Sequence, residues 1–442
     1  MSTLNDVVIT KLSGGLGRRT PEQDMVSGLL FDGVATEKLP LDQVKRLASL
    51  EDAETLGITA DYDVNGQSAY YQIQQFFRMN PSGDLYIMKV KALSYEEVAQ
   101  RALQMQEKAN GNIRQMAIIF SGAQTGFLET EKAVRAAQNA ASLAYENYMP
   151  FETILEGKGV DVTADADFFL TGLNAENVSV VIAMDVEKAF EQKLLKKGTL
   201  TLYSLAPDEV LVPTQTFPDI YNVKTPDGLK KENEVLLEVV FKDSYKNTAA
   251  VGLALGAISK AKVSENIAWI EKFNLTGEGF AKAGFVGGKE IKSLAELRAF
   301  NEKRYIFTRT HTGLAGIYFN DSHTCTTGTA DFAYIENNRT INKATRLLRS
   351  ALLPKLASPV LVDIDGKLPQ SVSKSFEGLC RSALEGMVAN QEVSAFDVYV
   401  DPKQNILATS ELKVKAEITP IGTARKIKVD LGFKNPFGID KA

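Results

Sequence analysis

The chain has 442 residues, of which 44% are hydrophobic and 24% charged, and its formal net charge is −5. This length predicts two or three domains with sizeable cores, and the acidic balance disfavours a general nucleic-acid binder. No apolar run reaches the roughly 18 residues that cross a bilayer, and the longest, residues 249–258, is about half that length. We therefore expect a globular protein with neither nucleic-acid binding nor direct membrane insertion.

The first 92 residues predict an isolated strand followed by a mixed region. Residues 5–11, NDVVITK, are typical of a short strand, and the glycines and proline of SGGLGRRTPEQD separate it from the body. The next elements are expected to be a strand in 25–34, a helix in 39–57 with Asp42 as N-cap and Gly57 as its stop, a helix in 68–79, and a buried strand in 85–93.

Residues 94–300 alternate between helical and apolar extended patterns. Helices are expected at 94–110 and 130–148, and strands at 116–122, 151–157 and 178–185. Such alternation predicts an α/β region with a largely parallel or mixed sheet.

The last third predicts more strands around two helices. Strands are expected at 304–310, 313–321, 359–365, 396–402 and 405–420, and helices at 342–356 and 371–390. The end of the chain, TARKIKVDLGF at 423–433, alternates cleanly and is isolated between two prolines. Its apolar side carries Ile427, Val429, Leu431 and Phe433, and its polar side carries Lys428 and Asp430.

The two terminal strands are separated from the body by flexible linkers. A lone strand leaves its backbone hydrogen-bonding groups unpaired, so each must join a sheet, and a sheet of another subunit is as accessible as its own. Both ends of the chain are basic whereas the remainder is acidic. This distribution is either chance or a sign that the ends seek an acidic partner, including another copy of the chain.

Several patterns resemble active sites without completing one. SGGLGRRT lacks the Lys-Ser/Thr pair of a phosphate loop, and no helix is expected to start there. Asp363 and Asp365 in VLVDIDGKL match the DxD strand end of a phosphatase, but too little chain follows to complete that fold; nor does DIDG continue into a calcium loop. A strand running into an Asp-Gly turn is the simpler interpretation.

The stretch HTGLAGIYFNDSHTC contains both histidines and one of the two cysteines. His311, His323 and Cys325 offer at most three zinc ligands, and an apolar strand separates the histidines by about 20 Å. We therefore expect no metal site and no cofactor. Two cysteines without a CxxC pair also fit a reducing compartment, and the N-terminus lacks the pattern of a secretory signal, which favours folding in the cytoplasm.

Three segments carry a resemblance to a known family. The run SAYYQIQQFFRMNPSGDLYIMKVKA resembles a stretch of contractile tail sheath proteins in which a helix ending in paired aromatics leads into a strand. YIENNRTINKATRLLRSALLPKL resembles the segment in which an Arg-bearing loop enters a long helix, and KAEITPIGTARKIKVDLGF is similar to the strand, proline, strand ending of those proteins. The resemblance covers residues 1–92 and 305–442, whereas 93–304 shows only a compatible α/β pattern.

This resemblance implies a structural subunit and not an enzyme. Sheath subunits stack as hexameric rings around an inner tube, exchange arm strands with their neighbours, and contract to drive the tube through an envelope. Val7, Val8 and Ile9 would lie in the N-terminal arm, and Ile427, Val429 and Leu431 in the C-terminal one. Implied partners are other copies, the inner tube protein, and baseplate and terminator proteins. Assembly would take place in the bacterial cytoplasm, in a phage tail or a phage-like injection particle.

The expected fold class is therefore α/β with mixed sheets, multidomain, with extended N- and C-terminal strand arms. The expected division is an N-terminal arm at 1–19, a first core part at 20–92, a middle α/β domain at 93–304, a C-terminal sheath domain at 305–419 and a C-terminal arm at 420–442. A different self-assembling tube or shell protein, and the DxD-type phosphatase, stay open as alternatives.

Overall fold

The computed structural model describes residues 24–433 with internal gaps. The gaps are 64–65, 123–125, 159–167, 190–191, 195–196, 206–210, 222, 225–237, 240, 244 and 246. Within the described part, no helix combines the length and apolarity needed to span a membrane.

A six-stranded sheet forms the centre of the main body, in the order β2-β3-β1-β4-β5-β6. The five strands from β3 to β6 in that order are parallel, and β2 pairs antiparallel at the edge. Their bounds are β1 Ser27–Asp32, β2 Val44–Leu47, β3 Leu85–Val90, β4 Gln115–Ile119, β5 Glu152–Glu156 and β6 Val178–Val181. The parallel strands are almost continuously buried, as expected of a sheet covered on both faces.

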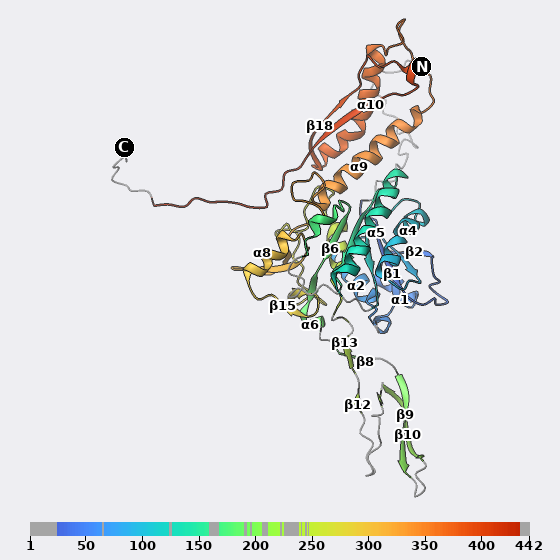
Figure 1. Ribbon diagram of the computed structural model, residues 1–442, viewed down its shortest axis with the longest axis vertical. Coiled ribbons are helices and arrows are strands. Elements are labelled where there is room, and N and C mark those ends of the chain that lie inside the picture. Colours follow the sequence, from blue (N-terminus) through green and yellow to red (C-terminus); the bar gives the residue numbers. More distant parts are fainter. Residues whose placement is uncertain are drawn as a thin grey trace, which may run out of the picture.

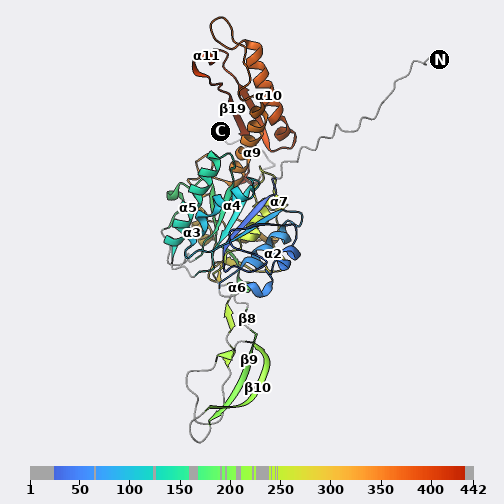
Figure 2. The ribbon, with the colours of Figure 1, turned by 90° about the vertical axis from the view of Figure 1, so that its right-hand side faces the viewer.

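Helices cover both faces of this sheet (Figure 2). On one face lie α2 (Ala69–Met79) and α7 (Val251–Lys260), and on the other α3 (Tyr95–Gln100), α4 (Ala102–Lys108) and α5 (Phe127–Glu146). The apolar run at 249–258 is thus part of a core helix, α7, which is buried along almost its whole length.

Smaller elements complete the body. A three-stranded sheet joins β7 (Ala183–Asp185), β14 (Ala283–Phe285) and β15 (Lys289–Glu290), beside α6 (Val186–Ala189). A hairpin of β16 (Thr308–His311) and β17 (Leu314–Phe319) follows α8 (Leu294–Glu302). Three strand pairs of the described residues extend away from the body between α6 and α7 (Figure 1). These are β8 Gln192–Leu194 with β13 Phe241–Asp243, β9 Lys197–Leu205 with β10 Leu211–Tyr221, and β11 Val223–Lys224 with β12 Glu238–Val239.

The C-terminal part projects from the opposite end of the body (Figure 1). It contains α9 (Ile335–Leu352), α10 (Gln370–Ala389) and an antiparallel pair of β18 (Val393–Tyr399) and β19 (Lys415–Pro420), with α11 (Ile406–Thr409) near its tip. A second hydrophobic core, separate from that of the body, holds it together; its buried members are Ala344, Cys380, Leu384, Met387, Val393 and Val398. The mixed α/β fold class is confirmed. The domain limits stay a prediction, although one sheet joins strands from both sides of residue 92.

The prediction of one helix over residues 39–57 is wrong. Residues Val44–Leu47 form β2, which pairs with β3, and only Leu50–Thr55 is helical. Ser49, not Asp42, caps this helix α1: its hydroxyl accepts from the backbone N–H of Asp52, whose carboxylate accepts in turn from the N–H of Ser49. Gly57 does end the helix, with a φ of 86° that suits glycine.

Three further elements differ from expectation. Residues 359–365 form an exposed loop and not a strand, because Asp363 Oδ1 accepts from the backbone N–H groups of Asp365 and Lys367 and so closes a turn. Of the strand expected at 405–420 only β19 forms, since Asn405 caps the short helix α11. The helix expected at 94–110 is divided at Arg101 into α3 and α4.

Candidate functional site

Helix α9 joins the body to the C-terminal part, and its first half is unusually polar for a buried helix (Figure 1). Glu336, Arg339 and Lys343 are all less than 10% exposed. Buried charges are costly unless they are paired, so this segment must have fixed partners. Those partners include Asp24, the first described residue, and Arg425, near the C-terminal end of the described chain.

The C-terminal arm is held to the body at Arg425. Its Nε lies 3.0 Å from Asp321 Oδ2, and its Nη2 lies 2.5 Å from Glu336 Oε1. The guanidinium also stacks on Tyr334, with its central carbon 3.4 Å from the ring centroid. A planar guanidinium can make all three contacts at once, whereas a lysine ammonium cannot.

The two carboxylates that receive Arg425 are fixed by their own neighbours. Asn266 Nδ2 donates to Asp321 Oδ1 at 2.6 Å and to Glu336 Oε1 at 3.1 Å. The hydroxyl of Ser322 donates to Glu336 Oε2. Burial raises the pKa of Glu336, an effect that the Ser322 hydrogen bond and the Arg425 charge oppose. Asp321, Glu336, Asn266, Ser322 and Tyr334 together form what we call the acidic socket.

The N-terminal end of the described chain is held by the same helix. Asp24 Oδ2 lies 2.6 Å from Lys343 Nζ, and Asp24 Oδ1 lies 3.2 Å from Arg346 Nη2. Lys343 Nζ also lies 2.7 Å from Glu392 Oε1, immediately before β18. Helix α9 therefore contacts the first described residue, the root of the C-terminal arm and the residue before β18.

Arg339 lies between these two attachments. Its guanidinium donates to the backbone carbonyls of Ala261 and Lys262, both at 3.2 Å. Burial lowers the pKa of Arg339 to about 10, so the side chain stays charged at neutral pH. It fixes the loop that leads to Asn266, and thus links the acidic socket to the middle of α9.

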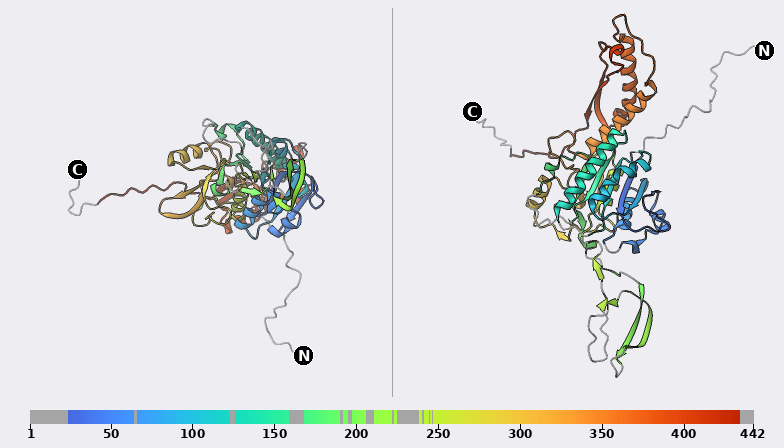
Figure 3. Two further views of the ribbon diagram at one scale, coloured as in Figure 1. Left: turned by 90° about the horizontal axis from the view of Figure 1, so that it is seen from below. Right: turned by 45° about the vertical axis from the view of Figure 1, so that its right-hand side comes forward.

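Beyond Arg425 the chain leaves the body as an extended segment (Figures 1 and 3). Ile427, Val429 and Leu431 are 81%, 77% and 96% exposed. Residues 426–433 belong to no strand in the described chain, so the pairing expected for this arm stays a prediction. Val7, Val8 and Ile9 lie outside the described residues.

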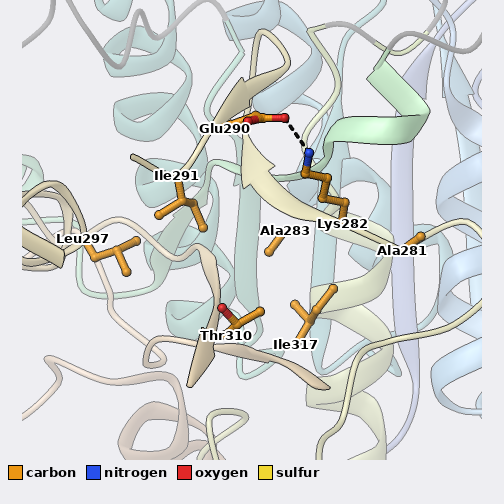
Figure 4. Close-up of a pocket in the computed structure, with 8 residues that line it drawn as sticks. All are labelled: Ala281, Lys282, Ala283, Glu290, Ile291, Leu297, Thr310 and Ile317. Carbon is orange, nitrogen blue, oxygen red and sulfur yellow. Dashed lines mark hydrogen bonds and ion pairs between the residues drawn. The ribbon is translucent and has the colours of Figure 1, made fainter. Parts of the chain in front are cut away.

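A groove with a volume of about 1490 Å³ runs beside the root of the C-terminal arm. Residues Ile421 to Arg425 line one side of it, and Trp269, Ile270 and Leu294 contribute exposed apolar surface on the other. A smaller cavity of about 320 Å³ lies beside β14 (Figure 4). It is lined mainly by aliphatic side chains, and at its rim Lys282 and Glu290 form an ion pair at 2.5 Å.

The two histidines and the cysteine of HTGLAGIYFNDSHTC make packing and hydrogen-bond contacts within the fold. His323 Nε2 donates a hydrogen bond to Asn301 Oδ1 at 3.0 Å, and burial lowers the pKa of His323 to about 4, so the ring is neutral at neutral pH. His311 packs against Tyr318. Cys325 is buried, which raises the pKa of its thiol, and its backbone pairs with Ala175. Among the described residues, no group of three His, Cys, Asp or Glu side chains is placed to hold a metal ion.

A polar cluster at the carboxyl ends of the parallel strands escaped the sequence analysis. This edge is where α/β proteins commonly bind ligands. Here Asp32 accepts from the backbone N–H and the hydroxyl of Ser121, and Lys158 Nζ donates to the carbonyl of Phe120. Burial raises the pKa of the neighbouring Glu156 to about 7. These contacts tie the strand ends to one another.

Glu152 on β5 is a further buried carboxyl, and it contacts α9. Its Oε1 accepts from the side-chain amides of Asn177 and Asn342 at 3.0 and 2.9 Å, while Oε2 is buried without a partner in the described chain. Burial raises the pKa of Glu152 to about 8, so the folded protein binds a proton there that the unfolded chain releases near pH 4.5. Stability from this group is complete below about pH 4.5 and is lost as the pH rises towards 8.

Glu152→Gln should therefore raise the melting temperature at about pH 9 by about 3 °C or more, since glutamine keeps the accepting oxygen and cannot ionise. It should also flatten the fall in melting temperature between about pH 5 and 9, measured by thermal denaturation. Exposed Glu107→Gln is the control and should change neither quantity. A variant as pH-sensitive as the parent would show that Glu152 is ionised when folded.

Comparison with protein families covers almost the whole chain. The description DUF2586, N-terminal domain, matches residues 4–323, and DUF2586, C-terminal domain, matches residues 331–438. The chain belongs to the DUF2586 family. The boundary between the two family domains lies at the start of α9, next to the acidic socket. Comparison with curated proteins by sequence gives no match.

Solved structures show which fold this DUF2586 protein has. The helical sheath of the anti-feeding prophage (AFP) in its contracted state has a TM-score of 0.55 and 12% identity, over 98% of this chain and 100% of that one. The PVC sheath complex of an extracellular contractile injection system, also contracted, has a TM-score of 0.56 and 10% identity, over 98% of both chains. A chain of the AFP baseplate has a TM-score of 0.55. The DUF2586 chain thus has the fold of contractile sheath proteins over nearly its full length.

The sequence analysis missed the residues that hold the arms. Asp24, Asp321, Glu336, Lys343 and Arg425 meet across sequence separations of up to 319 residues, which no local pattern indicates. One signal was present. The first half of α9, IENNRTINK, has only two apolar residues, Ile335 and Ile341, and such a polar helix in a packed position needs polar partners from elsewhere in the chain.

Proposed function

We propose that this protein is the subunit of a contractile sheath, assembling as stacked hexameric rings around an inner tube. Its role is structural and not enzymatic. The observation that carries the proposal is the extended, exposed C-terminal arm on a body with the sheath fold over 98% of the chain. An alternating segment with one apolar side exposes that side to water at a cost in free energy, and this cost is removed when another chain covers it.

The C-terminal sheet is the surface best suited to receive an arm. In the described residues it consists of β18 and β19 alone, so each strand leaves one edge unpaired. Its inner face packs on α9 and α10 through Val398, Ala416 and Ile418. A two-stranded sheet is only marginally stable, and added strands would complete it by backbone hydrogen bonds.

Side-chain patterns of arm and sheet agree with such pairing. An arm strand beside this sheet would continue the inner face with Ile427, Val429 and Leu431. Its outward Lys428 would then lie among exposed carboxylates such as Asp397 and Glu417, each about two-thirds exposed. The contact is heterologous, because arm and sheet are different surfaces, and such contacts build rings and helical filaments.

The remaining parts of the proposal concern the assembled particle. Flexible linkers would keep the arms attached while body-to-body contacts change during contraction. The partners would be other copies of the chain, an inner tube protein, and baseplate and terminator proteins. Assembly would take place in the bacterial cytoplasm, and the product would be a phage tail or phage-like injection particle.

Negative-stain electron microscopy of the purified chain, alone and with its inner tube protein, tests the proposal. A contractile sheath should give wide, hollow cylinders with helical striations. Hollow assemblies without striations would favour a different self-assembling shell. A protein that stays monomeric in both preparations, at concentrations well above those of cell extracts, would contradict a sheath role.

A further inference from the structure

Arg425, which binds in the acidic socket, lies five residues after the end of β19, and this position has a mechanical consequence. Strand β19 ends at Pro420 in the C-terminal part, whereas Arg425 is bound to Asp321 and Glu336 at the edge of the body. Residues 421–425 therefore bridge from one part to the other along the groove. Beyond Arg425, residues 426–433 are all exposed.

Resting on the proposed sheath function, we propose that the acidic socket is a clamp that sets the free length and the exit point of the C-terminal arm. With Arg425 bound, the tether begins at Lys426. With Arg425 released, residues 421–425 join the tether and add roughly 16 Å to its reach. One ion-paired side chain thus selects between two arm lengths.

The socket is built for a guanidinium and not merely for any positive charge. The side chains of Asp321 and Glu336 are 11% and 3% exposed, and each accepts a hydrogen bond from Asn266 Nδ2 as well as binding Arg425. Both carboxylates bind the same nitrogen of Asn266, and two buried negative charges that lie so near each other need a cation to offset their repulsion. Tyr334 supplies a flat surface for the guanidinium, and its ring also lies 4.8 Å from the guanidinium carbon of Arg304.

The clamp is also well placed to transmit force. Glu336 belongs to α9, and seven residues further along the same helix Lys343 binds Asp24, the first described residue. Asp24 and Arg425, which lie near the two ends of the described chain, are therefore attached to one helix. A pull on the C-terminal arm acts directly on the start of α9 while Arg425 is bound, and is transmitted through β19 when Arg425 is released.

The test uses a nitroxide spin label at Lys426→Cys in the full-length chain, since native Cys325 and Cys380 are buried and should not react. Arg425→Gln should increase label mobility, read from the room-temperature spectrum, by at least about two-fold. Arg425→Lys should fall between, because it keeps the charge and loses the planar fork. Glu336→Gln should loosen the label from the other side of the contact.

Lys428→Gln is the matched control, because it removes one positive charge from an exposed arm side chain that has no contact with the socket. It should leave the label immobile, and circular dichroism should show all variants folded. Equal mobility in the parent and in Arg425→Gln would overturn the clamp, as would equal loosening by Lys428→Gln. Label mobility and circular dichroism are both measured on the unassembled chain. The clamp can therefore be disproved even if the protein forms tubes, and the sheath function can be disproved even if the clamp is confirmed.

Discussion

Replacing Ile427, Val429 and Leu431 together by aspartate should abolish assembly and leave the subunit folded. In the single chain these side chains are 77 to 96% exposed, so the change removes almost no contact from the body. In an assembled sheet each would bury its apolar surface, worth about 1.5–3 kcal/mol per side chain, and three buried carboxylates would add a further cost. We expect a monomer with an unchanged melting temperature and no cylinders in electron micrographs.

The matched control changes the other face of the same strand. Lys426→Gln, Lys428→Gln and Asp430→Asn alter three neighbouring exposed side chains and keep the apolar face intact. These residues would point to solvent in an added strand, so assembly should persist, with weaker dependence on salt. Normal cylinders from the aspartate variant would show that the arm does not hold subunits together.

Gly252→Ala should destabilise the body by about 3 kcal/mol or more, because its added methyl group would collide with backbone. A Cβ at Gly252 would lie 2.1 Å from the carbonyl oxygen of Gln72 on α2. The side chain of Gln72 fixes the two helices further, since it accepts from the N–H of Gly252 at 2.6 Å and donates to the carbonyl of Ala249 at 2.7 Å. Helices α2 and α7 cannot separate without losing these bonds.

Thermal denaturation of the purified chain measures this effect, and we expect a melting temperature lower by about 6 °C or more. Gly378→Ala on α10 is the control: a Cβ there meets nothing within 4 Å, so alanine's higher helix propensity should stabilise slightly. A Gly252→Ala variant as stable as the parent would mean that the close contact of α2 and α7 is absent in solution.

Elements with strong periodicity could be predicted from the sequence, and those that depend on partners could not. The alternation of helix and strand from β3 to β6 follows from local pattern, and so does the long helix α10. The helix expected at 39–57 failed because Val44–Leu47 lies beside β3, and pairing with an existing sheet outweighs a helical pattern. The strand predicted at 359–365 was wrong for the opposite reason: this segment is largely apolar, but no strand of the described chain lies beside it to pair with.

The apolar residues of the C-terminal arm could be predicted from the sequence, whereas the residues that hold the arm to the body could not. Ile427, Val429 and Leu431 form an alternating pattern that is visible in eleven consecutive letters, TARKIKVDLGF. Arg425 is one basic residue among several in that stretch, and nothing local distinguishes it from Lys426. Its role depends on Glu336, 89 residues away, and on the orientation that Asn266 gives to two carboxylates. Such a site becomes visible only in three dimensions.

A helical reconstruction of the assembled protein from electron micrographs tests the central claim most directly. We predict cylinders in which residues 427–433 of one subunit form a strand beside β18 or β19 of a neighbour, with Ile427, Val429 and Leu431 facing α9 and α10 of that neighbour. Cylinders in which this segment lies against its own body, or in which subunits join without it, would contradict the proposal.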